Sequence, residues 1–189
     1  ITFLRPLARP ARRLAVLLVA ALLVTACEDP FEVTASTPNV DRTFSVWAMS
    51  GTPASYPSAV YVADASAARL DDDGVFDLAF DLDPEGRVMV LPVSRVVSPV
   101  AGSRLVEFQR VPGPFNTIAE APRTGWKADS LLLVAEGQPF LVKVAQSYCA
   151  FDIRQEIFGK FVVDSIIPGE RRIVVTARVN PNCGFRSLL

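Results

Sequence analysis

Residues 75–82, with the sequence VFDLAFDL, set the strongest limit on the fold of this chain. From Phe76 onward, large apolar residues alternate with small or acidic ones. Side chains of a β-strand point to opposite faces in turn, so this pattern predicts a strand with one buried and one exposed face. Asp83-Pro84-Glu85-Gly86 follows and predicts a tight turn. Residues 87–93 then form the partner strand of a hairpin.

The same alternation recurs through the rest of the body, without a convincing amphipathic helix. Residues 130–135 and 140–146 flank a turn at 136–139, and residues 158–167 and 171–179 flank a turn at 168–170. Further strand candidates are residues 43–49, 59–63 and 104–111. Many short strands without helical crossovers are typical of antiparallel sandwiches and barrels. We therefore predict an all-β fold, an antiparallel β-sandwich of immunoglobulin-like or similar Greek-key type, over residues 42–189.

The first 26 residues have a different character. Their charged residues are all arginines: Arg5, Arg9, Arg12 and Arg13. Residues 14–26, LAVLLVAALLVTA, follow as an apolar run in which only Thr25 is polar. A membrane-spanning helix needs about 20 apolar residues, and this run is shorter. Its length and the preceding positive charges are typical of the hydrophobic helix of an export signal or anchor.

Val24-Thr25-Ala26-Cys27 ends the apolar run and resembles the lipobox of bacterial lipoproteins. In that class an aliphatic residue, a small residue and Ala or Gly precede the lipidated Cys. The resemblance covers residues 1–27 only. It implies that Cys27 receives diacylglycerol and that residues 1–26 are a signal peptide cleaved before Cys27. The alternative is an uncleaved membrane anchor in which Cys27 has no special role.

The resemblance also implies a location. The protein would be exported and lipid-anchored at the periplasmic or cell-surface face of a bacterial membrane. Residues 27–41 would be the lipidated cysteine and a flexible linker, which contains prolines and few aliphatic residues. The β-rich body of residues 42–189 would then stand off the lipid surface.

Composition excludes several kinds of chemistry. The chain has no histidine, so it lacks the commonest general base near neutral pH and the commonest ligand of transition metals. Net charge is −1, and the arginines of the first 26 residues leave the body acidic. An acidic body gives no electrostatic reason to expect nucleic-acid binding. We expect no cofactor and no metal site.

Three cysteines are present, and a lipidated Cys27 would leave Cys149 and Cys183 as a pair. Each of these two follows a predicted strand end, where neighbouring segments can meet. Thiols exposed to an oxidising compartment form disulfides, so we predict a Cys149–Cys183 bond. The alternatives are two free thiols or a metal site, and two thiolates without histidine make a poor metal site.

No catalytic motif emerges from the sequence. Serine and cysteine nucleophiles paired with histidine are impossible, and no G-x-S-x-G or phosphate-binding loop occurs. Residues 81–86 are similar to the start of a calcium-binding loop, but Pro92 stands where that loop has a bidentate Glu. A hairpin turn explains those residues better. Residues 71–74, DDDG, favour a solvated turn over a weak calcium site.

The segment 112–127 is the longest without a strand pattern, and long loops often carry function. It contains Phe115 and Trp126, which we predict to contact a partner or ligand. Trp47 lies inside a predicted strand and favours the core instead.

Three functions remain open. The favoured one is a non-enzymatic structural or interaction role, as an accessory or scaffold subunit that docks on a protein partner in a larger envelope or membrane complex. The second is a surface lipoprotein that binds a carbohydrate or peptide near Trp126. The third is a carboxylate-based hydrolase, because paired acids can cleave glycosides without histidine.

Overall fold

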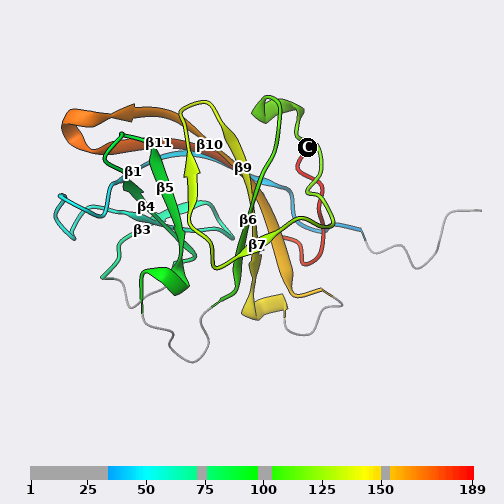
Figure 1. The fold of residues 1–189 in the computed structure, drawn as a ribbon. Helices are drawn as coiled ribbons and strands as arrows, with labels where there is room; N and C mark the ends of the chain where they lie inside the picture. The colour runs from blue at the N-terminus through cyan, green and yellow to red at the C-terminus, as the bar shows by residue number, and fades with distance from the viewer. Residues whose placement is uncertain (1–33, 72–75, 98–103, 150–153) are drawn as a thin grey trace, which may run out of the picture. The chain divides into compact units, whose positions relative to one another are not determined.

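The computed structural model describes residues 34–71, 76–97, 104–149 and 154–189, which form two antiparallel sheets (Figure 1). The six-stranded sheet has the order β1 (Val40–Trp47), β11 (Arg172–Asn180), β10 (Glu156–Ile167), β9 (Pro139–Ala145), β6 (Val106–Arg110) and β7 (Lys127–Ala128). The five-stranded sheet has the order β3 (Ser66–Ala68), β2 (Ala59–Tyr61), β4 (Leu78–Leu82), β5 (Val88–Pro92) and β8 (Leu132–Val134). The only helices among the described residues are short 3₁₀ turns: η1 (Val93–Arg95), η2 (Phe115–Thr117), η3 (Ser147–Cys149) and η4 (Pro168–Glu170).

The prediction of an all-β, antiparallel fold is confirmed. The predicted signal or anchor helix, Cys27 and the first part of the linker lie outside the described residues. A compact unit spans Ala35–Leu189, and its first strand begins at Val40.

Both sheets contribute to one hydrophobic cluster. The alternating residues of β11, Ile173, Val175, Ala177 and Val179, are fully buried in it. They pack in the same cluster as Phe80 and Val90 of the five-stranded sheet. The rings of Phe140 and Phe161 stack with their centroids 5.6 Å apart. Burying each such aromatic side chain contributes about 1.5–3 kcal/mol, so this cluster is the main source of stability.

Strand β4 differs from its prediction as a half-exposed strand. Asp77 is fully buried and Asp81 is 5% exposed, although both lie on the face predicted to meet solvent. The reason is that the connections before and after β2, which itself pairs with β4 in the same sheet, lie against these side chains. Val62 N donates to Asp77 Oδ2 at 2.7 Å, and the Ser50 hydroxyl donates to Asp81 Oδ2 at 2.6 Å. The acidic side chains therefore fix these connections instead of meeting water.

Two of the three predicted hairpins are confirmed and one is wrong. Strands β4 and β5 pair across the predicted turn, and so do β10 and β11. Strands β8 and β9 do not pair, because β9 already has β6 and β10 as neighbours. The predicted turn exists, with Gly137 at φ +76° and Gln138 N donating to Ala135 O at 3.1 Å. It is a corner that carries the chain from the five-stranded sheet to the six-stranded sheet.

Candidate binding site at the open edge of the five-stranded sheet

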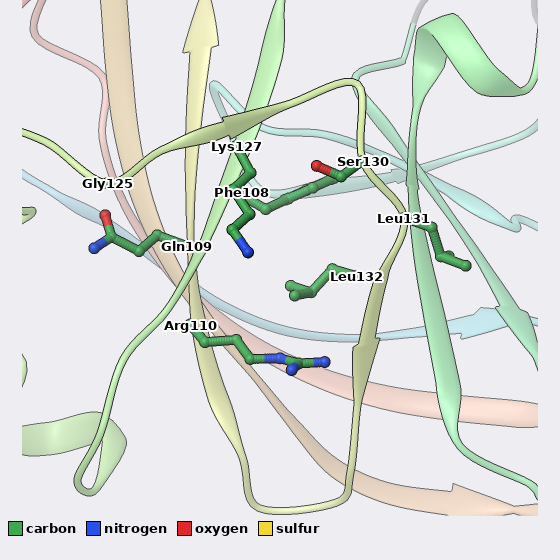
Figure 2. A pocket seen from close by; sticks show the side chains of 8 residues that line it. All are labelled: Phe108, Gln109, Arg110, Gly125, Lys127, Ser130, Leu131 and Leu132. Atoms are coloured by element: carbon green, nitrogen blue, oxygen red, sulfur yellow. The ribbon is translucent and has the colours of Figure 1, made fainter.

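The chain crosses between the sheets twice in succession, from β7 to β8 and from β8 to β9. These crossings frame a pocket of about 390 Å³ beside β6, which we call the edge pocket (Figure 2). It is lined by Phe108, Gln109, Arg110, Gly125, Lys127, Ser130, Leu131 and Leu132.

The edge pocket combines an apolar floor with two cations. Phe108 and Leu132 are buried, 2% and 9% exposed, and belong to the main core. Figure 2 shows Arg110 and Lys127 reaching from the β6–β7 side into the opening. No acidic residue lines the pocket. An apolar surface with convergent polar groups is the usual composition of a ligand site, and the charges here favour an anionic group.

Glycine at position 125 keeps the pocket wall in place. Gly125 has φ +92°, a conformation that side chains disfavour. A Cβ added there would lie 2.9 Å from Gln109 Nε2. Gln109 Oε1 is buried without a hydrogen-bond partner in the described part of the chain. The pocket wall therefore contains an unsatisfied acceptor, which is unusual for a buried polar atom.

The ladder of the five-stranded sheet determines where the backbone groups of β8 point. The N–H and C=O groups of Phe80 both bond outside the β4–β5 ladder, so Phe80 and its partner Val90 form a non-hydrogen-bonded pair. Bonding alternates along an antiparallel ladder, so Met89 bonds toward β4. Leu133, which lies opposite Met89, must then direct its N–H and C=O away from β5.

The open edge of β8 is only partly satisfied. Arg110 Nη2 donates to Leu133 O at 2.5 Å, in agreement with the ladder argument. Ala135 N, on the same side, donates to the side-chain oxygen Oε1 of Gln138 at 3.3 Å. The Leu133 N–H also points away from β5, and no acceptor for it is found among the described residues. The edge next to the pocket can therefore accept a further strand.

Apolar side chains lie on the outer face beside this edge. Met89 of β5 is opposite Leu133, and Leu91 and Leu131 directly follow and precede the paired residues Val90 and Leu132. Leu131 is 41% exposed, and the other three are half-buried and not part of the main core. We call Met89, Leu91, Leu131 and Leu133 the edge patch. Together, the edge pocket, the open backbone and the edge patch form the candidate binding site.

The two contact residues predicted from sequence lie elsewhere, on the outer face of the six-stranded sheet. Trp126 is half-buried against Phe158, with ring centroids 5.7 Å apart, and Nε1 donates to Pro122 O at 3.0 Å. Lys143 Nζ lies 5.5 Å from the Trp126 ring centroid. Phe115 is also half-buried. Both aromatic residues therefore hold the 112–127 segment onto the sheet, and their role in ligand contact stays a prediction.

Lys160 is a buried residue that sequence reasoning did not single out. It is 2% exposed, and its ammonium donates to Phe115 O at 3.2 Å and to Ile118 O at 2.8 Å. The same group lies 4.8 Å from the Phe115 ring centroid. Burial lowers the pKa of Lys160, and the charge of Arg178 acts in the same direction. No local pattern distinguishes this lysine from Lys127, which is exposed in strand β7.

A buried ion pair lies at the start of β4. Arg104 Nε donates to Asp77 Oδ1 at 2.5 Å, and Arg104 Nη2 donates to Phe76 O at 3.2 Å. The guanidinium also lies 5.1 Å from the Tyr61 ring centroid. Burial raises the pKa of Asp77, whereas Arg104 and the Val62 N–H lower it. Both carboxylate oxygens have partners, so this geometry favours a structural role over general-base chemistry.

The predicted disulfide is present. Cys149 in η3 bonds to Cys183 after β11, with the Cα atoms 5.6 Å apart and Cys149 fully buried. The Tyr148 hydroxyl donates to Pro181 O at 3.2 Å beside it. Disulfides persist in oxidising compartments, so the bond is consistent with export.

The acidic turn after β4 is a hairpin. Asp83 accepts hydrogen bonds from Arg87 N at 2.7 Å and Arg87 Nε at 2.6 Å, and Gly86 N donates to Asp83 O at 3.0 Å. Within the described ranges, no group of three or more His, Cys, Asp or Glu side chains could hold a metal ion. Asp72, Asp73 and Gly74 of the other acidic cluster lie outside those ranges.

Among the described residues, no helix combines the length and apolar character needed to cross a membrane. Comparison with known proteins gives no family for this chain: no family model, no curated protein and no solved structure matches it.

Proposed function

We propose that this chain is an exported, lipid-anchored protein whose body is a non-enzymatic interaction module for a protein partner in a larger envelope or membrane complex. The observation that carries the proposal is the open edge of β8 between a basic pocket and an apolar patch. Exposed strand edges are aggregation hazards unless they are covered, so an edge flanked by contact surface favours a bound partner.

The body is proposed to be a β-sandwich of immunoglobulin-like or similar Greek-key type. Support for the sandwich comes from the single hydrophobic cluster to which both sheets contribute. Strands that are distant in sequence lie side by side, as β1 and β11 do. An experimentally determined structure of the body tests the assignment of its connectivity.

Lipid attachment at Cys27 is proposed from the Val24–Cys27 resemblance, and the disulfide supports an oxidising location. Each buried CH₂ of an acyl chain contributes about 0.8 kcal/mol, so two or three chains hold a protein firmly at a bilayer. Metabolic labelling with a palmitate analogue should mark the wild type and not Cys27→Ala. Equal labelling of both proteins would contradict lipid attachment at Cys27.

The interaction role is tested by gentle solubilisation of membranes, cross-linking and identification of what remains bound. We expect one stoichiometric partner with the wild type and its loss with Lys127→Glu, which reverses a charge of the edge pocket. Arg42→Glu, at an exposed position of strand β1 at the other edge of the six-stranded sheet, is the matched charge-reversal control. A chain that runs as a free monomer throughout would contradict the role.

A second candidate is a carbohydrate- or peptide-binding surface lipoprotein. A depression of about 470 Å³ lies on the outer face of the six-stranded sheet and includes Lys143, which contacts Trp126. Its remaining lining residues are Leu105, Glu107, Ala145, Arg154, Gln155 and Glu156. Titration of a Trp47→Phe variant with a glycan panel would report on Trp126 alone, and no fluorescence change would remove this candidate.

The hydrolase alternative has less support. Glu107 and Glu156 line the same depression, but the Glu107 carboxylate forms an ion pair with Lys143. A carboxylate that is already paired with a lysine is less available to a substrate. A broad activity screen of the wild type without turnover would exclude this alternative.

A further inference from the structure

We propose that the edge of β8 binds an extended peptide segment of the partner, which adds to the five-stranded sheet as a sixth strand and directs a carboxylate into the edge pocket. The inference rests on the proposed interaction role and specifies its site and the chemistry of the partner segment.

Backbone groups supply the first part of the match. Leu133 directs its N–H and C=O groups away from β5, and an added strand pairs with such outward groups. Strand addition to a free sheet edge is an established mode of peptide recognition, in which main-chain bonds supply affinity. The edge is short, so an added segment of a few residues would cover it.

Side-chain alternation supplies the second part. Successive side chains of an added strand would point to opposite faces of the sheet. On the outer face they would extend the edge patch, where Leu131 and Leu133 favour apolar partners. On the inner face they would enter the edge pocket beside Phe108 and Leu132. The partner segment is thus expected to alternate apolar residues with residues that suit the pocket.

Charge determines which residues suit the pocket. Arg110 and Lys127 line it without an acidic neighbour among the lining residues, and the described structure gives Lys127 no ion-pair partner. Arg110 now donates to Leu133 O. An incoming backbone N–H would replace that bond and release the guanidinium to a carboxylate. Charge-assisted hydrogen bonds are about twice as strong as neutral ones, so this exchange favours an acidic segment.

A second copy of this chain fits the site less well. Pairing β8 with β8 of another copy would bring Arg110 and Lys127 near the same cations of that copy. Like charges facing each other across a contact are destabilising, so the geometry favours an acidic partner over self-association.

The experiment uses the full chain in detergent and a fluorescent, end-capped hexapeptide that alternates Val with Glu. Matched peptides carry Gln or Lys in place of Glu. We expect the Glu peptide to bind at least about tenfold more tightly than the Gln peptide, the equivalent of one charge-assisted bond, and the Lys peptide to bind weakest. Equal affinities, or no binding of the Glu peptide at millimolar concentration, would overturn the inference.

Two variants test separately how the backbone of β8 and the charge of the edge pocket contribute to peptide affinity. Leu133→Pro removes an outward N–H and no hydrogen bond of the β5–β8 ladder, which edge strands tolerate. It should reduce Glu-peptide affinity at least about tenfold, whereas Leu133→Val, which changes the side chain and keeps the N–H, should not. Lys127→Glu should reverse the preference between the Glu and Lys peptides. Unchanged affinity of Leu133→Pro, or an unchanged preference of Lys127→Glu, would contradict the proposal.

Amide hydrogen exchange of the wild type keeps the test independent of the variants' folding. The bound Glu peptide should slow exchange at Leu133 and leave the amides of Leu132 and Val134, which point toward β5, unchanged. Protection confined to other strands would overturn the site. A concentration-dependent dimer that Leu133→Pro abolishes would also overturn it, in favour of a second copy. If Leu133→Pro retained the partner, the edge of β8 would not be the binding site, but the proposed interaction role would still stand.

Discussion

Lys160, Asp77 and Asp81 are buried charges, and each holds a connecting segment to a sheet. Lys160 binds two carbonyls of the segment that covers the six-stranded sheet. Asp77 and Asp81 bind the connections before and after β2. Burying a charge is unfavourable unless it is paired or hydrogen-bonded, so these residues make the position of each segment specific.

Lys160→Met retains the aliphatic stem and leaves the carbonyls of Phe115 and Ile118 without their donor. An unsatisfied buried acceptor costs about 1–3 kcal/mol, so we expect a loss of about 2 kcal/mol in urea unfolding near neutral pH. Lys127→Met, in an exposed position, is the control and should change stability by less than about 0.5 kcal/mol. Equal stability of both variants would show that Lys160 does not hold the segment.

The lowered pKa of Lys160 also gives the wild type a pH dependence with a definite sign. Between that pKa and the ordinary value of 10.5, the unfolded chain binds the proton more readily than the folded one. Stability therefore rises with pH across this window, and it does so relative to Lys160→Met. Unfolding free energies of both proteins are measured at several alkaline pH values. The value for the wild type minus the value for Lys160→Met should increase with pH, and a decrease would contradict the expectation.

Arg104→Met leaves the Asp77 carboxylate buried without its cation. Removing one partner of a buried ion pair costs about 3–5 kcal/mol, and we expect a loss near the lower limit because Arg104 is partly exposed. The loss should shrink as pH falls, since Asp77 then takes a proton. Urea unfolding at neutral pH and near pH 4 tests this. Arg87→Met, which removes an exposed arginine from its pair with Asp83, should cost much less.

At the scale of elements, local sequence predicted the strands better than their partners. Alternation in residues 158–179 was sufficient for β10 and β11, because the pairing is local. The turn at 136–139 gave the same signal, yet its flanking strands join different sheets. A turn motif indicates where the chain reverses direction. It does not indicate which strand will pair with the strands that flank the turn. The candidate site, which arises at that corner, was for the same reason absent from the sequence prediction.

Burial of both faces of an element was also hidden from the sequence. Asp77 and Asp81 alternate with apolar residues as solvent-facing acids do, and only the connections before and after β2 distinguish them. The same holds for Trp126 and Phe115, whose place in a long loop suggested contact with a partner. Long-range packing onto the six-stranded sheet decides their exposure, and no local period encodes it.

Strand β10 crosses the core so closely at Gly159 that it has no room for a side chain. A Cβ there would lie 2.9 Å from both Phe161 Cε2 and Val179 Cγ2. Overpacking a core costs about 1–3 kcal/mol, so Gly159→Ala should destabilise by that amount. Gly169, in the turn between β10 and β11, has nothing within 4 Å of an added Cβ, so Gly169→Ala is the matched control. Similar unfolding midpoints of the two variants would contradict the close packing of Phe161 and Val179 around Gly159.

At the scale of the whole molecule, the disulfide stabilises a body whose core is shared by two sheets. The Cys149–Cys183 bond joins residues 34 apart in sequence. In the chain-entropy model, closing a loop of this length contributes about 4 kcal/mol by restricting the unfolded chain. The bond joins the segment after β9 to the segment after β11. These two strands are the neighbours of β10 in the sheet, so the bond links them on either side of β10.

The double variant Cys149→Ala with Cys183→Ala should therefore lose about 4 kcal/mol in urea unfolding and show a larger denaturant dependence, because its unfolded chain is less compact. Cys27→Ala is the control: it should lose the lipid but keep the stability of the body, since Cys27 has no part in the cross-link. A thiol assay of the oxidised Cys27→Ala protein should find no free thiol. Two free thiols, or a double variant within about 1 kcal/mol of the wild type, would mean that the core alone stabilises the body.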